Sequence, residues 1–112
     1  MHVRIIAAVA ALALAAPAAA KETRFWNLTS ATVRSLELAP VATDAFGPNQ
    51  CLNDPDGAVD HDERVRVVGV PTGVYVARLK FADDRTCMAR HVLIEAGKVF
   101  AIEEKDLTDC TK

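Results

Sequence analysis

Apolar and polar residues alternate with a period of two over several short stretches of this chain of 112 residues. The clearest stretch is residues 74–81, in which one face carries Tyr75, Ala77, Leu79 and Phe81. Arg78 and Lys80 fall on the other face, and this pattern is typical of a strand with one buried and one wetter side. After residue 20 no helical periodicity is long enough for a helix of three turns. We therefore expect an all-β fold.

Five further stretches concentrate β-branched and aromatic residues, as strands do. They are residues 23–28, 32–38, 64–70, 87–94 and 98–103. Pro-Thr-Gly at 71–73 predicts a hairpin between the strands on either side of it, and Glu-Ala-Gly at 95–97 predicts another, with Gly97 at positive φ. Asp83-Asp84 marks the turn between these two pairs. About six short strands predict a small antiparallel β-sandwich or open barrel.

Residues 1–20 have the composition of an export signal peptide. A basic start with His2 and Arg4 precedes an apolar run over residues 5–16, and the alanines at 18–20 suit a signal peptidase. Cleavage after Ala20 would leave a single domain, residues 21–112, in the periplasm or outside the cell. The alternative is a retained membrane anchor, but about twelve apolar residues are fewer than the roughly twenty that span a bilayer.

The charge balance argues against a nucleic-acid partner. Thirteen Lys and Arg stand against fifteen Asp and Glu, and the basic residues are scattered along the chain. A domain of this size builds one modest core, burying about 60 to 65% of the surface that its unfolded form exposes. A covalent brace would therefore contribute a large share of its stability.

Three cysteines, Cys51, Cys87 and Cys110, lie after the signal peptide. An oxidising compartment favours a disulfide, and an odd number leaves one thiol over. We favour Cys87 with Cys110, because this bond would pin the C-terminal tail to the sheet and contribute roughly 3 kcal/mol in the chain-entropy model. Cys51 would then be a small buried thiol beside Leu52. A bond from Cys51 to Cys87 or to Cys110 stays an alternative.

Residues 39–63 differ from the rest of the chain, because they carry three prolines and two glycines with few consecutive apolar residues. We expect this interval to be mostly loop. A loop of about 25 residues in so small a domain is typical of a functional or mobile segment.

An acidic run inside this interval resembles the twelve-residue calcium loop. With Gly57 at the sixth position, four ligand positions fall on Asp54, Asp56, Asp60 and Glu63. Leu52, however, stands at the first position, where an aspartate belongs, and Pro55 stiffens the fourth. The simpler interpretation is a solvated acidic turn. A zinc site through His61 and nearby carboxylates is a weaker hypothesis.

No complete catalytic constellation is present. Two serines and two histidines follow the signal peptide, without a Gly-x-Ser-x-Gly elbow, so a hydrolase would need Asp60, His61 or His91 beside a serine. We expect His91 to be a half-buried structural residue on a strand. The tripeptide Asn27-Leu28-Thr29 matches the N-glycosylation pattern, but we interpret it as a strand residue followed by a turn.

Several short motifs make residues 25–110 resemble a group of small exported bacterial proteins of unassigned function. The motifs are Asn27-Leu28-Thr29, Ser-Leu-Glu-Leu-Ala-Pro at 35–40, Phe-Gly-Pro-Asn at 46–49, Gly-Val-Tyr-Val-Ala-Arg-Leu at 73–79, the Asp-rich turn, and Asp-Leu-x-x-Cys at 106–110. The resemblance implies a β-sandwich with the late disulfide and supplies no activity.

These observations lead to one functional hypothesis and one alternative. We expect an exported, non-enzymatic β-sandwich without a cofactor, which binds an unknown protein or small-molecule partner through residues 39–63. The alternative is a calcium-dependent module that holds one ion through Asp54, Asp56, Asp60 and Glu63.

Overall fold

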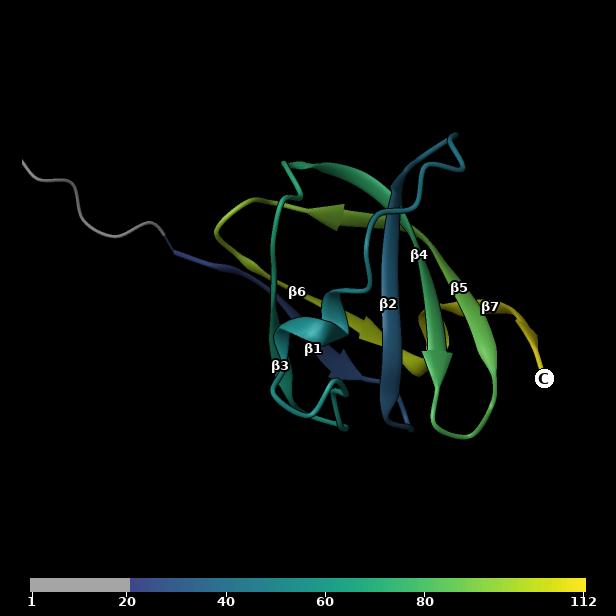
Figure 1. Ribbon diagram of the computed structural model, residues 1–112. Helices are drawn as coiled ribbons and strands as arrows, with labels where there is room; N and C mark the ends of the chain where they lie inside the picture. The colour runs from purple at the N-terminus through teal and green to yellow at the C-terminus, as the bar shows by residue number, and fades with distance from the viewer. Residues whose placement is uncertain (1–20) are drawn as a thin grey trace, which may run out of the picture.

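The computed structural model describes residues 21–112, and this part of the chain contains seven strands and two short 3-10 helices (Figure 1). The elements are β1 (Thr23–Leu28), β2 (Val33–Pro40), η1 (Gln50–Asn53), β3 (Arg64–Val67), β4 (Gly73–Phe81), β5 (Thr86–Ile94), β6 (Val99–Glu103), η2 (Glu104–Asp106) and β7 (Leu107–Thr111). The all-β prediction is confirmed. The predicted signal peptide, residues 1–20, lies outside the described residues, and none of the helices within them is long and apolar enough to cross a membrane.

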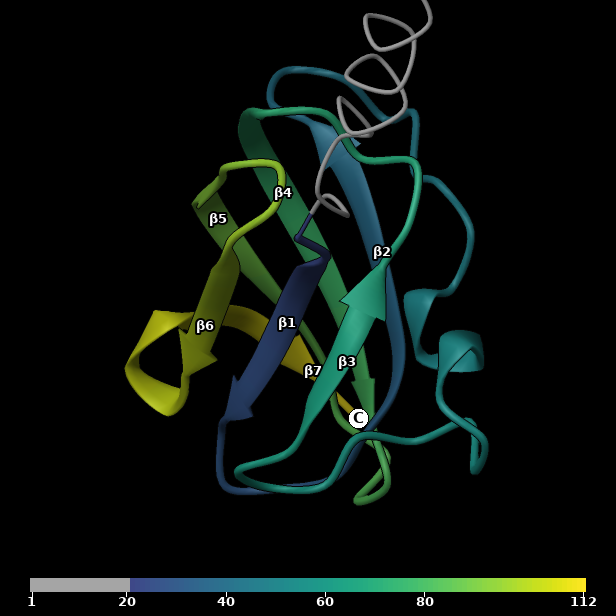
Figure 2. The ribbon, with the colours of Figure 1, turned by 90° about the vertical axis from the view of Figure 1, so that its left-hand side faces the viewer.

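The strands form two sheets that pack face to face. One has three strands in the order β3-β1-β6, and the other has four in the order β2-β4-β5-β7. In Figure 2 the three-stranded sheet lies in front of the four-stranded one. Neighbouring strands run antiparallel except β1 and β6, which are parallel. The sandwich prediction is thus confirmed, with one strand more than expected.

The two predicted hairpins are wrong. The link at 68–72 crosses from one sheet to the other, since β3 pairs with β1 whereas β4 pairs with β2 and β5. The link at 95–98 also changes sheets, although Gly97 has the predicted positive φ of 84°. The hairpin is instead β4–β5, through the turn at Asp83-Asp84. A period of two tells which face of a strand is buried, but not which strand lies beside it.

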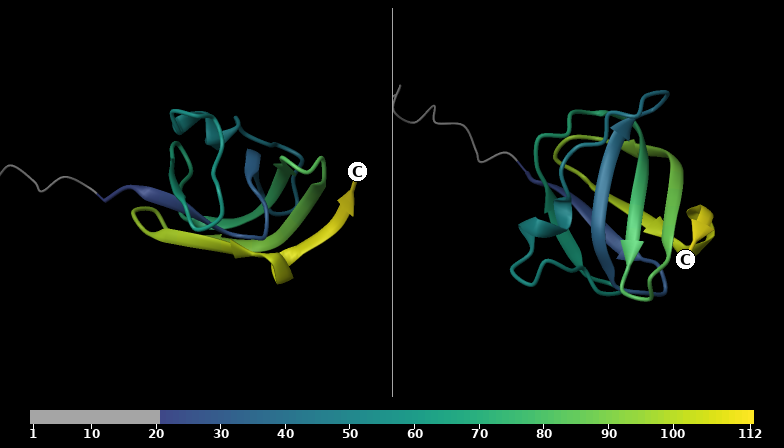
Figure 3. Two further views of the ribbon diagram at one scale, coloured as in Figure 1. Left: turned by 90° about the horizontal axis from the view of Figure 1, so that it is seen from below. Right: turned by 45° about the vertical axis from the view of Figure 1, so that its right-hand side comes forward.

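The seventh strand, β7, was not predicted. It pairs with β5, and Cys110 is bonded to Cys87 as predicted. Figure 3 shows the chain passing from β6 through η2 into β7. Of the β7 residues only Leu107 is half-buried, so the strand lacks an alternating pattern that the sequence could reveal. Its place depends on main-chain pairing and the disulfide.

The core lies between the sheets and has the predicted alternation. The inward-facing residues of both sheets are completely or almost completely buried, and they include Phe25, Leu36, Leu79, Ile94 and Ile102. Phe25 and Phe100 pack in a tilted pair with ring centroids 5.7 Å apart. The four apolar residues that define one face of β4 in the sequence are all buried.

The segment around η1 closes one side of the sandwich. Asn49 Oδ1 accepts from Leu36 N, and Asn49 Nδ2 donates to Arg34 O, so this side chain covers the edge of β2. Gln50 bonds both backbone groups of Val68, and Asn53 Nδ2 donates to Arg66 O, which covers the edge of β3. Part of the interval predicted as loop is therefore a cover for two sheet edges, which would otherwise expose unpaired groups.

Candidate binding surfaces

The acidic run at 54–63 uses its carboxylates within its own turns. Asp54 Oδ1 accepts from Asp56 N at 2.8 Å, and Glu63 Oε1 accepts from Asp60 N at 2.8 Å. Asp60 Oδ1 also accepts from Thr32 Oγ1 at 2.7 Å, which joins the run to the start of β2. The Asp54 bond is that of an Asx turn, in which a short acidic side chain takes the place of a backbone acceptor. The carboxylates of Asp54, Asp60 and Glu63 thus accept hydrogen bonds that stabilise the fold.

Within residues 21–112 no group of three or more His, Cys, Asp or Glu is placed to hold a metal ion. The calcium hypothesis therefore has no geometric support from Asp54, Asp56, Asp60 and Glu63, and it stays a prediction. The zinc hypothesis is in the same position, because His61 Nδ1 lies 2.8 Å from Thr29 O.

Asn27 and Thr29 form a buried polar cluster at one end of β1. Both are fully buried, and Asn27 Nδ2 donates to Ala31 O and Val59 O, while its Oδ1 accepts from Thr29 N and Thr29 Oγ1. The cluster ties the β1–β2 turn to the end of the long segment. The Asn27-Leu28-Thr29 motif is thus structural, and its amide is not accessible to a glycan.

The histidines and serines do not assemble in the described residues. His61 bonds backbone, Ser30 Oγ donates to Glu104 at 2.9 Å, and neither histidine of this range is hydrogen-bonded to a serine. The prediction that His91 is half-buried is wrong: it is exposed, with φ of 59°. His91 lies at a β-bulge, where two residues of β5, Arg90 and His91, face the single residue Val76 of β4. The extra residue interrupts the regular alternation of side chains along β5.

Cys51 is the unpaired, buried thiol that the sequence predicts. Burial, with a smaller contribution from the charge of Asp54, raises the pKa of this thiol to about 12. Its thiolate is therefore scarce at neutral pH, and a nucleophilic role has no support. Leu52, by contrast, is 72% exposed beside it.

An apolar hollow of about 220 Å³ opens at the end of the sandwich where β2 ends and β4 begins. The long segment supplies one wall, and the β3–β4 link supplies the other. Its lining includes Leu38, Pro40, Pro48, Val68, Val70 and Tyr75. Two contacts fix these walls, because Tyr75 Oη donates to Pro71 O at 2.6 Å and Gln50 bonds Val68. We call this feature the end hollow.

The sequence predicts only one wall of the end hollow. It names residues 39–63 as the contact surface, and Leu38 and Tyr75 as strand residues, but it assigns Val68 and Val70 to a strand. Both lie instead in the link that crosses between the sheets. The sequence contains one signal for an earlier end of this strand, which is Gly69, two residues before Pro71. In the structure Gly69 has φ of 76°, and β3 ends before it at Val67.

A second surface is the outer face of β1 and β3, where Arg24, Trp26, Arg64 and Arg66 lie. Arg24 is opposite Arg66, and Trp26 is opposite Arg64. The Arg64 guanidinium lies over the Trp26 ring, 4.2 Å from its centroid, and Trp26 Nε1 donates to Asp62 Oδ1 at 2.9 Å. We call this feature the arginine face. The sequence analysis does not predict this juxtaposition, because it depends on the β1–β3 pairing.

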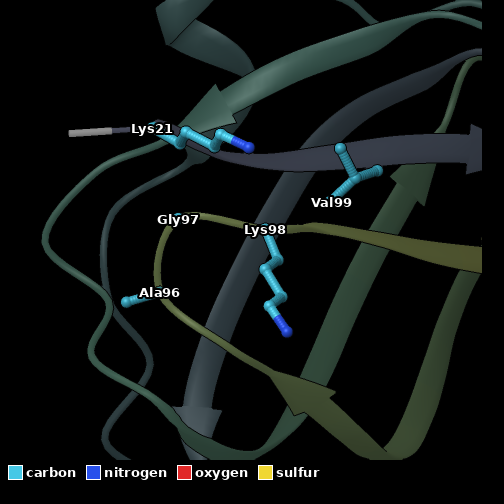
Figure 4. A pocket seen from close by; sticks show the side chains of 5 residues that line it. All are labelled: Lys21, Ala96, Gly97, Lys98 and Val99. Carbon is cyan, nitrogen blue, oxygen red and sulfur yellow. The ribbon is translucent and has the colours of Figure 1, made fainter. Parts of the chain in front are cut away.

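Two wider hollows have less definite chemistry. One, about 660 Å³ and open, lies where the turn at 95–98 meets Lys21; Figure 4 shows the Lys98 and Val99 side chains on opposite sides of the strand. Lys98 is already paired with Glu95. The other, about 330 Å³, lies on the outside of the four-stranded sheet beneath residues 42–46 and has Val76 and Arg90 in its lining.

A polar network joins the β4–β5 turn to the β1–β2 turn. Glu104 accepts from Ser30 N and from Arg85 Nη1, and Arg85 Nε also pairs with Asp83. The Ser30 N–H and then Arg85 hold the pKa of Glu104 below its usual value, and the Arg85 backbone N–H does the same for the pKa of Asp83. These acids are engaged in holding turns and are not poised for proton transfer.

No family model, curated protein or solved structure matches this chain. The resemblance to small exported bacterial proteins therefore stays a prediction.

Proposed function

We propose that this chain is an exported, non-enzymatic binding module whose end hollow receives an apolar group from a partner. The observation that carries the proposal is the hollow itself, with fixed walls of leucine, proline, valine and tyrosine. Export is supported by the predicted signal peptide and is consistent with the Cys87–Cys110 disulfide.

The size of the end hollow favours a single large side chain over a whole small molecule. Its volume of about 220 Å³ is below the roughly 300 to 1,000 Å³ of clefts that enclose drug-sized ligands. Val68, which lines the end hollow, is 55% exposed, so part of the rim is also apolar. A partner with one protruding aliphatic or aromatic side chain would bury both the floor and the rim, which is how interface anchors work.

Peptide selection tests the proposal directly. Random peptides displayed on phage are selected for binding to the purified protein. The selected peptides are then added to the protein while its backbone amide NMR signals are recorded. We expect a shared large apolar residue in the selected peptides, and signal changes at Gly47, Val68 and Gly69.

A matched pair of variants makes the result specific. Val68→Asp should abolish binding, whereas Val99→Asp, at a valine of similar exposure on the outside of β6, should leave it intact. Selected peptides that bind Val68→Asp as well, or that move signals only elsewhere, would refute the end hollow as the binding surface.

A further inference from the structure

The arginine face places two like charges opposite each other. Asn27 N–H bonds Glu63 O, so alternation along the antiparallel β1–β3 ladder makes Arg24 and Arg66 a non-hydrogen-bonded pair. In such pairs the side chains are closest, with Cα atoms about 4.5 Å apart, and like charges there are destabilising. Two guanidinium groups in this arrangement attract a shared anion.

Arg64, on the same face, is held in a defined orientation. Its guanidinium lies over the Trp26 ring, 4.2 Å from the centroid, and that ring is itself fixed by the bond from Trp26 Nε1 to Asp62 Oδ1. Cation–π stacking leaves the N–H edge of a guanidinium free to donate. Within residues 21–112, neither Arg64 nor Arg66 forms an ion pair with a carboxylate.

A hollow of about 220 Å³ adjoins these side chains and gives a bound group somewhere to sit. The guanidinium-bearing residues Arg24, Arg64 and Arg66 line it, together with Asn53 and the two acidic residues Glu22 and Asp54. Glu22 is 3.2 Å from Arg24 and leaves it partly neutralised. With Asp62 beside Trp26, the surroundings hold as many carboxylates as guanidiniums, so they carry no net positive charge that would attract an extended polyanion.

We propose that Arg24, Arg64 and Arg66 bind one compact tetrahedral oxyanion, the phosphate or sulfate ester group of a soluble and otherwise uncharged ligand. Guanidinium groups match such oxyanions with paired N–H donors. The three nearby carboxylates restrict the site to one anionic group. This site is distinct from the end hollow, so either can fail without the other.

Titration with glycerol phosphate, and separately with sodium sulfate, tests the proposal. At low ionic strength we expect saturable changes in the arginine Nε–Hε signals of these three residues and in the indole N–H signal of Trp26. Arg66→Gln should weaken binding about tenfold, as loss of one charge-assisted contact does. Arg34→Gln is the matched control and should bind like the unchanged protein, because Arg34 lies exposed on the other sheet and has no ion-pair partner in the described part of the chain.

Three results would overturn the proposal. The first is a response that does not saturate with either probe. The second is equal binding by Arg66→Gln and the unchanged protein; the thermal transition of the variant, measured beside it, shows whether a loss of binding comes from the site or from the fold. The third is binding to phosphatidylglycerol vesicles without any response to soluble glycerol phosphate, which would assign the face to a membrane surface.

Discussion

The outer faces of the two sheets handle arginine in opposite ways. In the four-stranded sheet Arg78 lies opposite Glu37 and pairs with it at 2.9 Å, while Arg90 pairs with Asp109 at 2.9 Å. In the three-stranded sheet Arg24 lies opposite Arg66. The first sheet pairs Arg78 and Arg90 with its own carboxylates, whereas among residues 21–112 the second leaves Arg64 and Arg66 without an ion-pair partner. This contrast separates a face that stabilises the fold from one that is suited to a ligand.

The two sheets also differ in how their outlying parts are secured, and here the largest effect is expected. Cys110→Ser removes the covalent bond that holds β7 on the four-stranded sheet. Loss of a disulfide that spans 23 residues of sequence separation should lower the free energy of unfolding by about 3 kcal/mol. Urea unfolding of the oxidised protein and the variant measures it.

Chemical reduction serves as the control for the disulfide. The reduced, otherwise unchanged protein should unfold at the same urea concentration as Cys110→Ser. A variant as stable as the oxidised protein would show that main-chain pairing alone secures β7.

The three-stranded sheet is secured by a buried polar cluster in place of a disulfide. Asn27→Ala removes a fully buried side chain and leaves the buried Thr29 N–H without its acceptor, whereas the carbonyl groups of Ala31 and Val59 keep their bonds from Thr29 Oγ1 and Val33 N. Unsatisfied buried groups cost about 1 to 3 kcal/mol, so we expect a loss of about 2 kcal/mol. Urea unfolding again gives the value.

Asn53→Ala is the comparison variant for Asn27→Ala. Its amide also bonds backbone, at Arg66 O, but in an exposed setting where water can replace it. Its cost should be clearly smaller. Equal losses in the two variants would contradict the claim that burial sets the value of the cluster.

Exchanging the charge pattern between the sheets tests whether their outer faces differ in how arginine contributes to stability. Glu37→Arg reproduces on the four-stranded sheet the like-charge pair of the other, and should lower the free energy of unfolding by about 1 kcal/mol. Arg66→Glu replaces the like-charge pair with an opposite-charge pair and should raise the free energy of unfolding by about 0.2 kcal/mol or more. The gain is small because Glu22 already forms an ion pair with Arg24. Thermal melting at low salt measures both. Destabilisation by Arg66→Glu would mean that the guanidinium of Arg66 supports the fold.

The sequence predicts what is local in this molecule and misses what is not. Alternation in residues 74–81 identified the buried face of β4, and the tail position of Cys110 identified its bond to Cys87. Neither hairpin was right, because an alternating strand fits any neighbour that buries its apolar face. The arginine face and the second wall of the end hollow both depend on that choice of neighbour. These two features could therefore not be predicted from the pattern of any single segment.

The last expected effect concerns acid, and it tests whether the β1–β2 turn and the β4–β5 turn are coupled through Glu104. Because its pKa is lowered in the folded protein, chiefly by the Ser30 N–H and then by Arg85, its contribution is present above its ordinary value of about 4.5. It is lost as the pH falls through the lower, folded pKa. Half of the Glu104 side chain is exposed, so the contribution should stay below about 1 kcal/mol. Glu104→Gln should flatten the decline of stability between about pH 5 and about pH 3, measured by urea unfolding. Arg85→Gln should flatten it less, because the Ser30 contact remains. An unchanged decline in Glu104→Gln would place the acid sensitivity elsewhere, with Asp83 the next carboxylate to test.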